Sequence, residues 1–241
     1  MKTICVSNSK GGIGKTTTAQ ALYEILQKKG YKVLGIDLDT QGNFTQVTSH
    51  HGNQKTVTHL IKGTPIKEVI EDDFIACDYS IMNVDGEDYK ADFLRESLKG
   101  LKGYDFCIID TPPRIDRLTL TAFVASNYVI STATTDSLAI QGVADMLKAV
   151  KSAKKQNKSL KPLGLLFVRY SPRSVLSKNI VEDMKQRESQ TGLKVFNTTI
   201  RESIAIREAQ YMGESLVTYA KKSKAMVDYT AFVEEVLKLI K

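Results

Sequence analysis

The chain has 241 residues, of which 42% are apolar, 25% charged and 7% aromatic, so it can bury a substantial core as one large domain or two small ones. Its 34 basic and 27 acidic residues give a net charge of +7, which favours anionic partners such as nucleic acid, an acidic lipid surface or a nucleotide. No apolar run reaches the roughly 18 residues of a membrane-spanning helix, and no secretory leader pattern opens the chain, so we expect a soluble, cytoplasmic protein.

Short apolar runs alternate with amphipathic segments, and this alternation predicts the fold. The apolar runs predict strands buried on both faces at Thr3–Asn8, Lys32–Asp37, Asp105–Asp110, Tyr128–Ala133 and Leu163–Val168. Apolar residues at helical spacing predict helices at Thr16–Lys29, Ser137–Ala153, Ser174–Gln190 and Ala225–Ile240. Because strands joined by helices make right-handed crossovers, we expect an α/β fold with a mostly parallel central sheet flanked by helices, in a single domain.

The segment from Phe44 to Leu101 has a weaker pattern. We expect a pair of short helices at His59–Ile70 and a further strand at Ile75–Val84. The adjacent His50 and His51 have no third ligand at useful spacing, so we expect surface loop residues rather than a metal site.

The three cysteines lie far apart and form no Cys-x-x-Cys or Cys/His ligand pattern. Cys5 and Cys107 fall within apolar runs. We therefore expect buried, reduced thiols.

A glycine-rich loop, SNSKGGIGKTTTAQ, joins the first predicted strand to the first predicted helix. Glycines let backbone N–H groups converge on phosphate oxygens where a Cβ atom would intrude, and the helix N-terminus adds a partial positive charge. Lys15 can then reach the β- and γ-phosphates and the Thr16 hydroxyl can ligate Mg²⁺. The loop is a variant of the general pattern, since Ser9 stands at its first glycine position. We expect nucleotide contacts from Gly11, Gly12, Ile13, Gly14, Lys15, Thr16 and Thr17.

Carboxylates follow two more predicted strands, in IDLDTQGN and IIDTPP. The carboxyl ends of parallel strands border the crevice where ligands bind, so Asp110 suits a magnesium role through water. Asp37 and Asp39 alternate in an extended segment, so only one of them can face the nucleotide directly. Either could instead cap the turn or helix that follows.

The motifs KGGIGKTTTA, IDLDTQGN and IIDTPP, in this order, resemble those of the ParA/Soj/MinD group of deviant Walker-A ATPases, a class of P-loop NTPases. The likeness runs almost end to end, through RYSPRSVLSK (Arg169–Lys178) and IREAQYMGESLVTYAKKSK (Ile206–Lys224), which resemble Soj-like ParA partition proteins. Longer plasmid members of the group carry an extra N-terminal DNA-binding domain. With no room for one before Lys2, we expect residues 1–241 to form the ATPase domain alone.

The resemblance implies a role for each motif residue. It implies Lys15 as the phosphate lysine, Thr16 as a Mg²⁺ ligand, Asp110 as the Walker-B acid and Asp37 near the metal, with ATP and Mg²⁺ as cofactors. It also implies that Asp39 orients the attacking water.

Lys10 matches the signature lysine of the group, which crosses to the nucleotide of the partner subunit. Such a lysine would place positive charge on the developing negative charge of the reaction and would couple ATP binding to homodimer formation. We therefore expect an ATP hydrolase that is slow alone and faster with a partner protein.

Two departures from the group stand out. Thr40 replaces a usual proline in IDLDTQGN, which affects loop stiffness more than chemistry. Arg201 replaces a proline that lies near the base in relatives, so the resemblance does not define how adenine is recognised at Thr199–Ser203.

Basic segments near the C-terminus suggest DNA binding. YAKKSK (Tyr219–Lys224) resembles the segment that contacts non-specific DNA in Soj-like relatives. Lysines bind phosphates as point charges, which suits sequence-independent and salt-sensitive binding. We expect DNA contacts from Lys221, Lys222, Lys224, Arg187 and Lys194. The lysine-rich Lys148–Lys161 is expected to be a solvated helix face.

Together these features predict an ATPase for DNA segregation, cytoplasmic and associated with the nucleoid. It would dimerise with ATP, bind DNA non-specifically and be stimulated by a ParB-like centromere-binding protein. One alternative is a MinD-like membrane-cycling ATPase, but the final segment resembles the closing helix of the fold rather than an added membrane anchor. The other is a nucleotide switch of the same fold without a partition role.

Overall fold

The computed structural model describes residues 1–84 and 89–240 and contains a six-stranded sheet at its centre. All pairs of neighbouring strands are parallel, in the order β3-β2-β4-β1-β5-β6. The strands are β1 (Lys2–Ser7), β2 (Val33–Asp37), β3 (Phe74–Ile75), β4 (Phe106–Asp110), β5 (Tyr128–Ala133) and β6 (Lys161–Phe167). The expected α/β fold with a mostly parallel sheet is confirmed.

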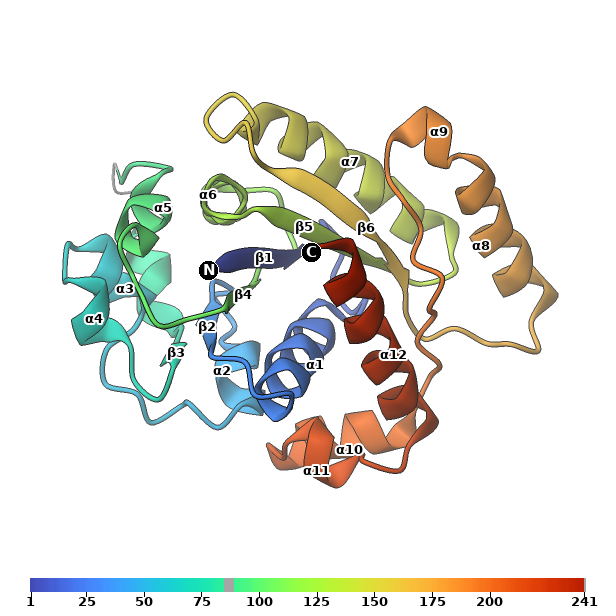
Figure 1. Cartoon of the computed structure of the whole chain (residues 1–241), viewed down its shortest axis with the longest axis horizontal. Coiled ribbons are helices and arrows are strands. Elements are labelled where there is room, and N and C mark those ends of the chain that lie inside the picture. The colour runs from blue at the N-terminus through green and yellow to red at the C-terminus, as the bar shows by residue number, and fades with distance from the viewer. Residues whose placement is uncertain (85–88, 241) are drawn as a thin grey trace.

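Helices cover both faces of this sheet (Figure 1). The first half of the chain forms α1 (Lys15–Lys28), α2 (Asn43–Val47), α3 (Val57–Ile61), α4 (Ile66–Val69), α5 (Phe93–Leu98) and α6 (Arg117–Ala125). The second half forms α7 (Ser137–Ala153), α8 (Val175–Gln186), α9 (Glu188–Thr191), α10 (Ile204–Met212), α11 (Leu216–Tyr219) and α12 (Lys224–Leu239).

Alternate side chains of the strands supply two cores. Ile4 and Val6 of β1 belong to the core that contains α1 and α12, whereas Cys5 belongs to the core of α6 and α7 on the other face. Both sets are fully buried, which explains why the strands read as continuous apolar runs. All three cysteines are buried and unpaired, as expected.

The structure differs from expectation in two segments. Ile75–Val84 is not a strand: only Phe74–Ile75 pairs with β2, and Tyr79–Val84 forms a 3-10 helix. The side chain of Asp78 accepts a hydrogen bond from the backbone N–H of Ser80 at 3.0 Å, which starts this turn and ends any extended chain. The single helix expected over Ser174–Gln190 is divided at Arg187 into α8 and α9.

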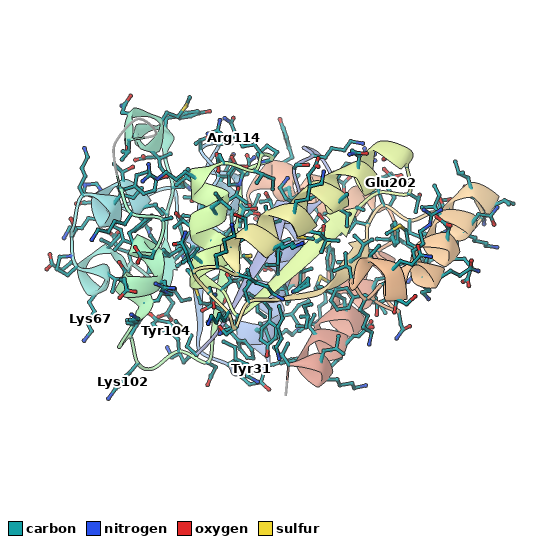
Figure 2. All side chains as sticks on the ribbon, turned by 90° about the horizontal axis from the view of Figure 1, so that it is seen from above. Tyr31, Lys67, Lys102, Tyr104, Arg114 and Glu202 are labelled. Atoms are coloured by element: carbon teal, nitrogen blue, oxygen red, sulfur yellow. The ribbon has the colours of Figure 1, made fainter. Side chains whose placement is uncertain are left out.

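Because the strands are parallel, their carboxyl ends form one edge of the sheet and their amino ends form the opposite edge (Figure 2). Arg114 follows β4 at the carboxyl edge, while Tyr31 and Lys102 precede β2 and β4 at the opposite, amino edge. Among the described residues, no helix is long and apolar enough to cross a membrane.

Candidate nucleotide site

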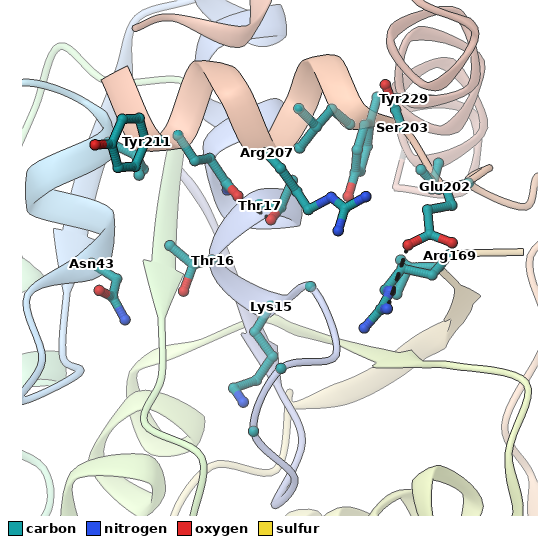
Figure 3. Close-up of a pocket in the computed structure, with 18 of the residues that line it drawn as sticks. Lys15, Thr16, Thr17, Asn43, Arg169, Glu202, Ser203, Arg207, Tyr211 and Tyr229 are labelled. Carbon is teal, nitrogen blue, oxygen red and sulfur yellow. Dashed lines mark hydrogen bonds and ion pairs between the residues drawn. The ribbon is translucent and has the colours of Figure 1, made fainter. Parts of the chain in front are cut away.

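A cavity of about 620 Å³ opens at the carboxyl edge of the sheet, between the glycine-rich loop and α10 (Figure 3). The loop and the start of α1 form one wall, and Arg207 and Tyr211 of α10 form the other. The predicted residues that line the cavity are Gly11, Gly12, Gly14, Lys15, Thr16, Thr17 and Asp39.

The backbone of the loop requires its glycines. Gly12 and Gly14 have φ angles of 70° and 74°, in the left-handed region that residues with a Cβ atom rarely adopt. A Cβ atom on Gly14 would also lie 3.2 Å from a methyl group of Val168. Ile13, between them, is only 2% exposed and does not line the cavity, so its side chain fixes the loop to the protein interior.

Lys15 is turned back into the loop that carries it. Its Nζ atom donates a hydrogen bond to the carbonyl oxygen of Lys10 at 2.8 Å, and the residue is only 6% exposed. Burial lowers the pKa of Lys15, while the charges of Asp110 and Asp39 oppose this shift. The ammonium group therefore lies at the centre of the loop, where phosphate oxygens would provide further acceptors.

Lys10 is held by a partner from the same chain. Its Nζ atom forms an ion pair with Oδ1 of Asp136 at 2.9 Å, and its backbone N–H donates to the side chain of Asn8 at 3.1 Å. Asp136 follows β5 and is followed by α7. Lys10 is thus bound by a carboxylate that lies 126 positions further along the same chain.

Thr16 and Asp110 meet beneath the loop. The Thr16 hydroxyl donates to Oδ2 of Asp110 at 2.7 Å, and Asp110 is fully buried. The other carboxylate oxygen of Asp110 has no hydrogen-bond partner among the described residues. Burial raises the pKa of Asp110, and the nearby charge of Asp37 adds to this shift. A buried, unpaired oxygen next to a hydroxyl is a donor set that fits Mg²⁺.

Asp37 and Asp39 point to different partners. Asp37 accepts hydrogen bonds from the backbone N–H of Asp39 at 2.9 Å and from the N–H and hydroxyl of Thr45 at 2.8 and 2.9 Å. It therefore caps the first turn of α2, and burial raises its pKa to about 6. Asp39 lines the cavity, and one of its oxygens accepts from the N–H of Gln41 at 3.1 Å.

The end of the cavity away from Lys15 contains residues that the motifs did not indicate. Gln210 of α10 donates a hydrogen bond to the Thr17 hydroxyl at 2.8 Å, and Figure 3 shows Arg207 one turn earlier pointing into the cavity. Helical spacing of 207 and 210 could have placed them on one face, but nothing in the sequence indicated what this face contacts.

Arg201 also lines the cavity. Its Nε and Nη2 atoms donate to the two oxygens of Asp228 at 2.7 and 2.6 Å, in a fork-shaped pair, and its backbone N–H donates to the same carboxylate. The guanidinium is thereby tied to α12.

The residues expected to contact DNA do not all lie together. Lys221 and Lys222 are exposed on the connection between α11 and α12, and Lys224 is exposed as the first residue of α12. Arg187 lies between α8 and α9 and pairs with Asp183, and α9 lies at the opposite end of the molecule from α11 in Figure 1. Lys194 follows α9 and is exposed.

The two adjacent histidines have different surroundings, and the described residues contain no cluster of three or more His, Cys, Asp and Glu side chains of the kind that holds a metal ion. His51 is exposed, as expected. His50 is instead half-buried and stacks on the ring of Phe74 at 4.2 Å between ring centres.

Comparison with known proteins identifies the relatives of this fold and site. The model of a family described as an AAA domain matches residues 1–162. The chromosome-partitioning ATPase Soj of Thermus thermophilus is 31% identical over 243 residues, which cover 98% of this chain and 96% of Soj. Apo McdA of Cyanothece is 26% identical with a TM-score of 0.84, over 98% of this chain and 99% of McdA. Cobyrinic acid a,c-diamide synthase of Mycobacterium smegmatis, crystallised with ADP and magnesium, is 25% identical with a TM-score of 0.84, over 99% of this chain and 94% of the synthase.

Proposed function

This chain belongs to the Soj/ParA-like family of partition ATPases, and on that premise we propose that it hydrolyses ATP with Mg²⁺ to segregate DNA. The arrangement of Thr16, Asp110 and Lys15 under the glycine-rich loop is the observation that carries the proposal. It combines a buried ammonium group for the phosphates with an oxygen pair for a divalent cation.

The metal would be held by the Thr16 hydroxyl and, through water, by Asp110, with Asp37 in the buried layer beside them. Mg²⁺ keeps most of its waters and takes few carboxylates, so phosphate oxygens would complete its shell. Bound there, the ion neutralises charge on the phosphates. Thr16 and Asp110 are already joined at 2.7 Å, so this pair is positioned before the ion arrives.

Catalysis would depend on Asp39 and Lys10. Asp39 is the carboxylate of the segment that faces the cavity, so it can accept a hydrogen bond from the attacking water and orient it. Lys10 would leave Asp136 and reach the nucleotide of a second subunit, where its charge stabilises the transition state. ATP binding and homodimer formation would then be one coupled event.

DNA binding and partner stimulation complete the proposed cycle. The ATP-bound homodimer would bind non-specific DNA through the exposed Lys221, Lys222 and Lys224. The protein would then act in the cytoplasm, associated with the nucleoid. A ParB-like centromere-binding protein would accelerate hydrolysis and release the dimer from DNA. Arg187 and Lys194 would supply contacts elsewhere on the surface.

The deciding experiment measures ATP turnover with and without DNA and a ParB-like protein, next to gel-shift assays with ATP, ADP and no nucleotide. We expect DNA binding only with ATP and turnover that rises when DNA and partner are both present. DNA binding that is the same with ATP, ADP and no nucleotide would contradict the partition function. The absence of any DNA binding at low salt would also contradict it. Flotation with anionic liposomes and ATP tests the MinD-like alternative.

Asp39→Ala separates binding from chemistry in the same assays. Loss of an orienting carboxylate costs about 10²–10⁴ in rate, whereas ATP-dependent dimerisation needs only the bound nucleotide. We therefore expect Asp39→Ala to dimerise with ATP and to lose turnover, and unchanged turnover would remove Asp39 from the mechanism.

A further inference from the structure

A second cavity, of about 290 Å³, lies between the end of α1 and the start of α12. Figure 1 shows α1, α11 and α12 side by side. Since α1 has 14 residues and rises 1.5 Å per residue, its far end lies about 20 Å from the glycine-rich loop that opens it. This groove is therefore separate from the nucleotide cavity, although one helix borders both.

The rim of the groove is basic. Lys28 and Lys29 come from the end of α1, and Lys221 comes from the connection between α11 and α12. Lys29 forms an ion pair with Glu234. Lys28 and Lys221, in contrast, have no carboxylate partner among the described residues. No carboxylate is among the residues that line the groove.

The floor of the groove is apolar. It is formed by Ile25, Val217, Met226 and Val227. Ile25 and Met226 are buried, but Val227, in the first turn of α12, is 60% exposed and lines the groove together with Lys28, Lys29 and Lys221. An exposed branched side chain next to ammonium groups suits a ligand that presents negative charge and apolar surface together.

Cations at the end of α1 could also serve only to offset the partial negative charge of the helix C-terminus. That role would account for Lys28 and Lys29. It would account neither for Lys221, which comes from another element, nor for the exposed Val227.

We propose that this groove binds the sugar–phosphate backbone of duplex DNA, with a phosphate between Lys28 and Lys221 and deoxyribose carbons against Val227. The inference rests on the proposed function and adds residues of α1 to the expected DNA-binding surface. Lys222 and Lys224, which follow Lys221 closely along the chain, are also exposed, so more than one phosphate of a polymeric anion can find a lysine here. Lysines give no fixed fork for a base edge, so the groove binds without reading sequence.

The test measures binding of the full-length protein with ATP to a fluorescent duplex of random sequence, by anisotropy over a range of salt concentrations. Lys28→Gln removes one phosphate contact, so we expect several-fold weaker binding and a salt slope smaller by about 0.9. Val227→Glu puts an anion on the floor and should remove most of the binding. Both positions are exposed, and ATP turnover without DNA should match that of wild type.

Lys62→Gln is the matched control, because Lys62 is also an exposed lysine at a helix end but follows α3, which packs in the core on the other face of the sheet. If wild type binds DNA and both groove variants bind it as well as Lys62→Gln does, the groove is not a DNA-binding site, while the proposed partition function stands. If wild type does not bind DNA with ATP, both the groove assignment and the proposed partition function are wrong. If the groove variants lose binding to anionic vesicles and keep binding to DNA, the groove belongs to a lipid surface and the DNA assignment is wrong.

Discussion

The Nζ atom of Lys10 lies 2.9 Å from Oδ1 of Asp136, and both side chains belong to one subunit. Lys10 is 33% and Asp136 46% exposed in their side chains, so water screens the pair and its contribution is about 1 kcal/mol or less. If Lys10 reaches the nucleotide of a partner subunit, as proposed, it must first leave this contact. Asp136 would then compete with dimer formation.

Asp136→Asn should make dimerisation with ATP easier. Removing one charge frees Lys10, and 1 kcal/mol corresponds to about a fivefold lower protein concentration at half-dimerisation per released lysine. Sedimentation with a slowly hydrolysed ATP analogue measures this. Asp145→Asn is the control, since Asp145 pairs with Lys148 of its own helix. An unchanged or higher midpoint for Asp136→Asn would show that the ion pair does not compete.

Gly142→Ala, in a helix that packs against the glycine-rich loop, should displace the loop and weaken nucleotide binding. A Cβ atom at position 142 of α7 would lie 2.1 Å from Oδ1 of Asn8, the atom that accepts the backbone N–H of Lys10. Overpacking of this kind costs about 1–3 kcal/mol of stability, and the displaced loop should bind a fluorescent ATP analogue more weakly. Gly52→Ala meets no atom within 4 Å and should behave like wild type. Equal affinity for all three proteins would mean that the loop does not depend on Asn8.

Asp110→Asn should raise the magnesium requirement. Asparagine can still accept a hydrogen bond from Thr16, but it lacks the negative charge that would hold a hydrated cation. We expect the Mg²⁺ concentration for half-maximal turnover to rise by about 10–100-fold, as for other residues that act on a metal through its ligands. Asp105→Asn, at the amino end of the same strand, is the control. A lower maximal rate with an unchanged Mg²⁺ midpoint would contradict this role.

Glu24 should make stability depend on pH. It accepts hydrogen bonds from Ser215 and from the backbone N–H of Val217, and burial raises its pKa above 4.5. The folded state then holds the proton more tightly than the unfolded state. The contribution of Glu24 to the free energy of unfolding should therefore increase as the pH falls from neutrality toward 4.5.

Urea unfolding of wild type and Glu24→Gln at several pH values measures this contribution. The stability difference between the two should shift in favour of wild type at lower pH. Glu208→Gln, at an exposed position, should show no such trend. A difference that does not vary with pH would mean that Glu24 has the same pKa in both states.

The sequence alone predicted the sheet and the phosphate loop because both are local patterns. A strand buried on both faces, such as Phe106–Asp110, is a continuous apolar run, and glycines at fixed spacing need no distant partner. Ile81 and Val84 also face the core, and the same reasoning extended the predicted strand over them although Tyr79–Val84 forms a 3-10 helix.

Contacts between distant segments could not be predicted in this way. Lys10 and Asp136 are 126 positions apart, and Thr17 and Gln210 are 193 positions apart. Spacing along the chain carries no information on such pairs, since they form only when α7 packs on β5 and β6 and when α10 comes to lie beside α1. The sequence also left open which of Asp37 and Asp39 faces the cavity, and the hydrogen bonds from Thr45 decided it.

Ile13 has a consequence for how ligand affinity arises. A flexible loop that wraps around an anion loses conformational entropy at the moment of binding, at about 1–2 kcal/mol per ordered residue. Here the buried Ile13 side chain and the Lys15–Lys10 hydrogen bond order the loop when the protein folds. The conformational entropy of the loop is therefore lost when the protein folds rather than when phosphate binds, and this pre-organisation increases the affinity for phosphate.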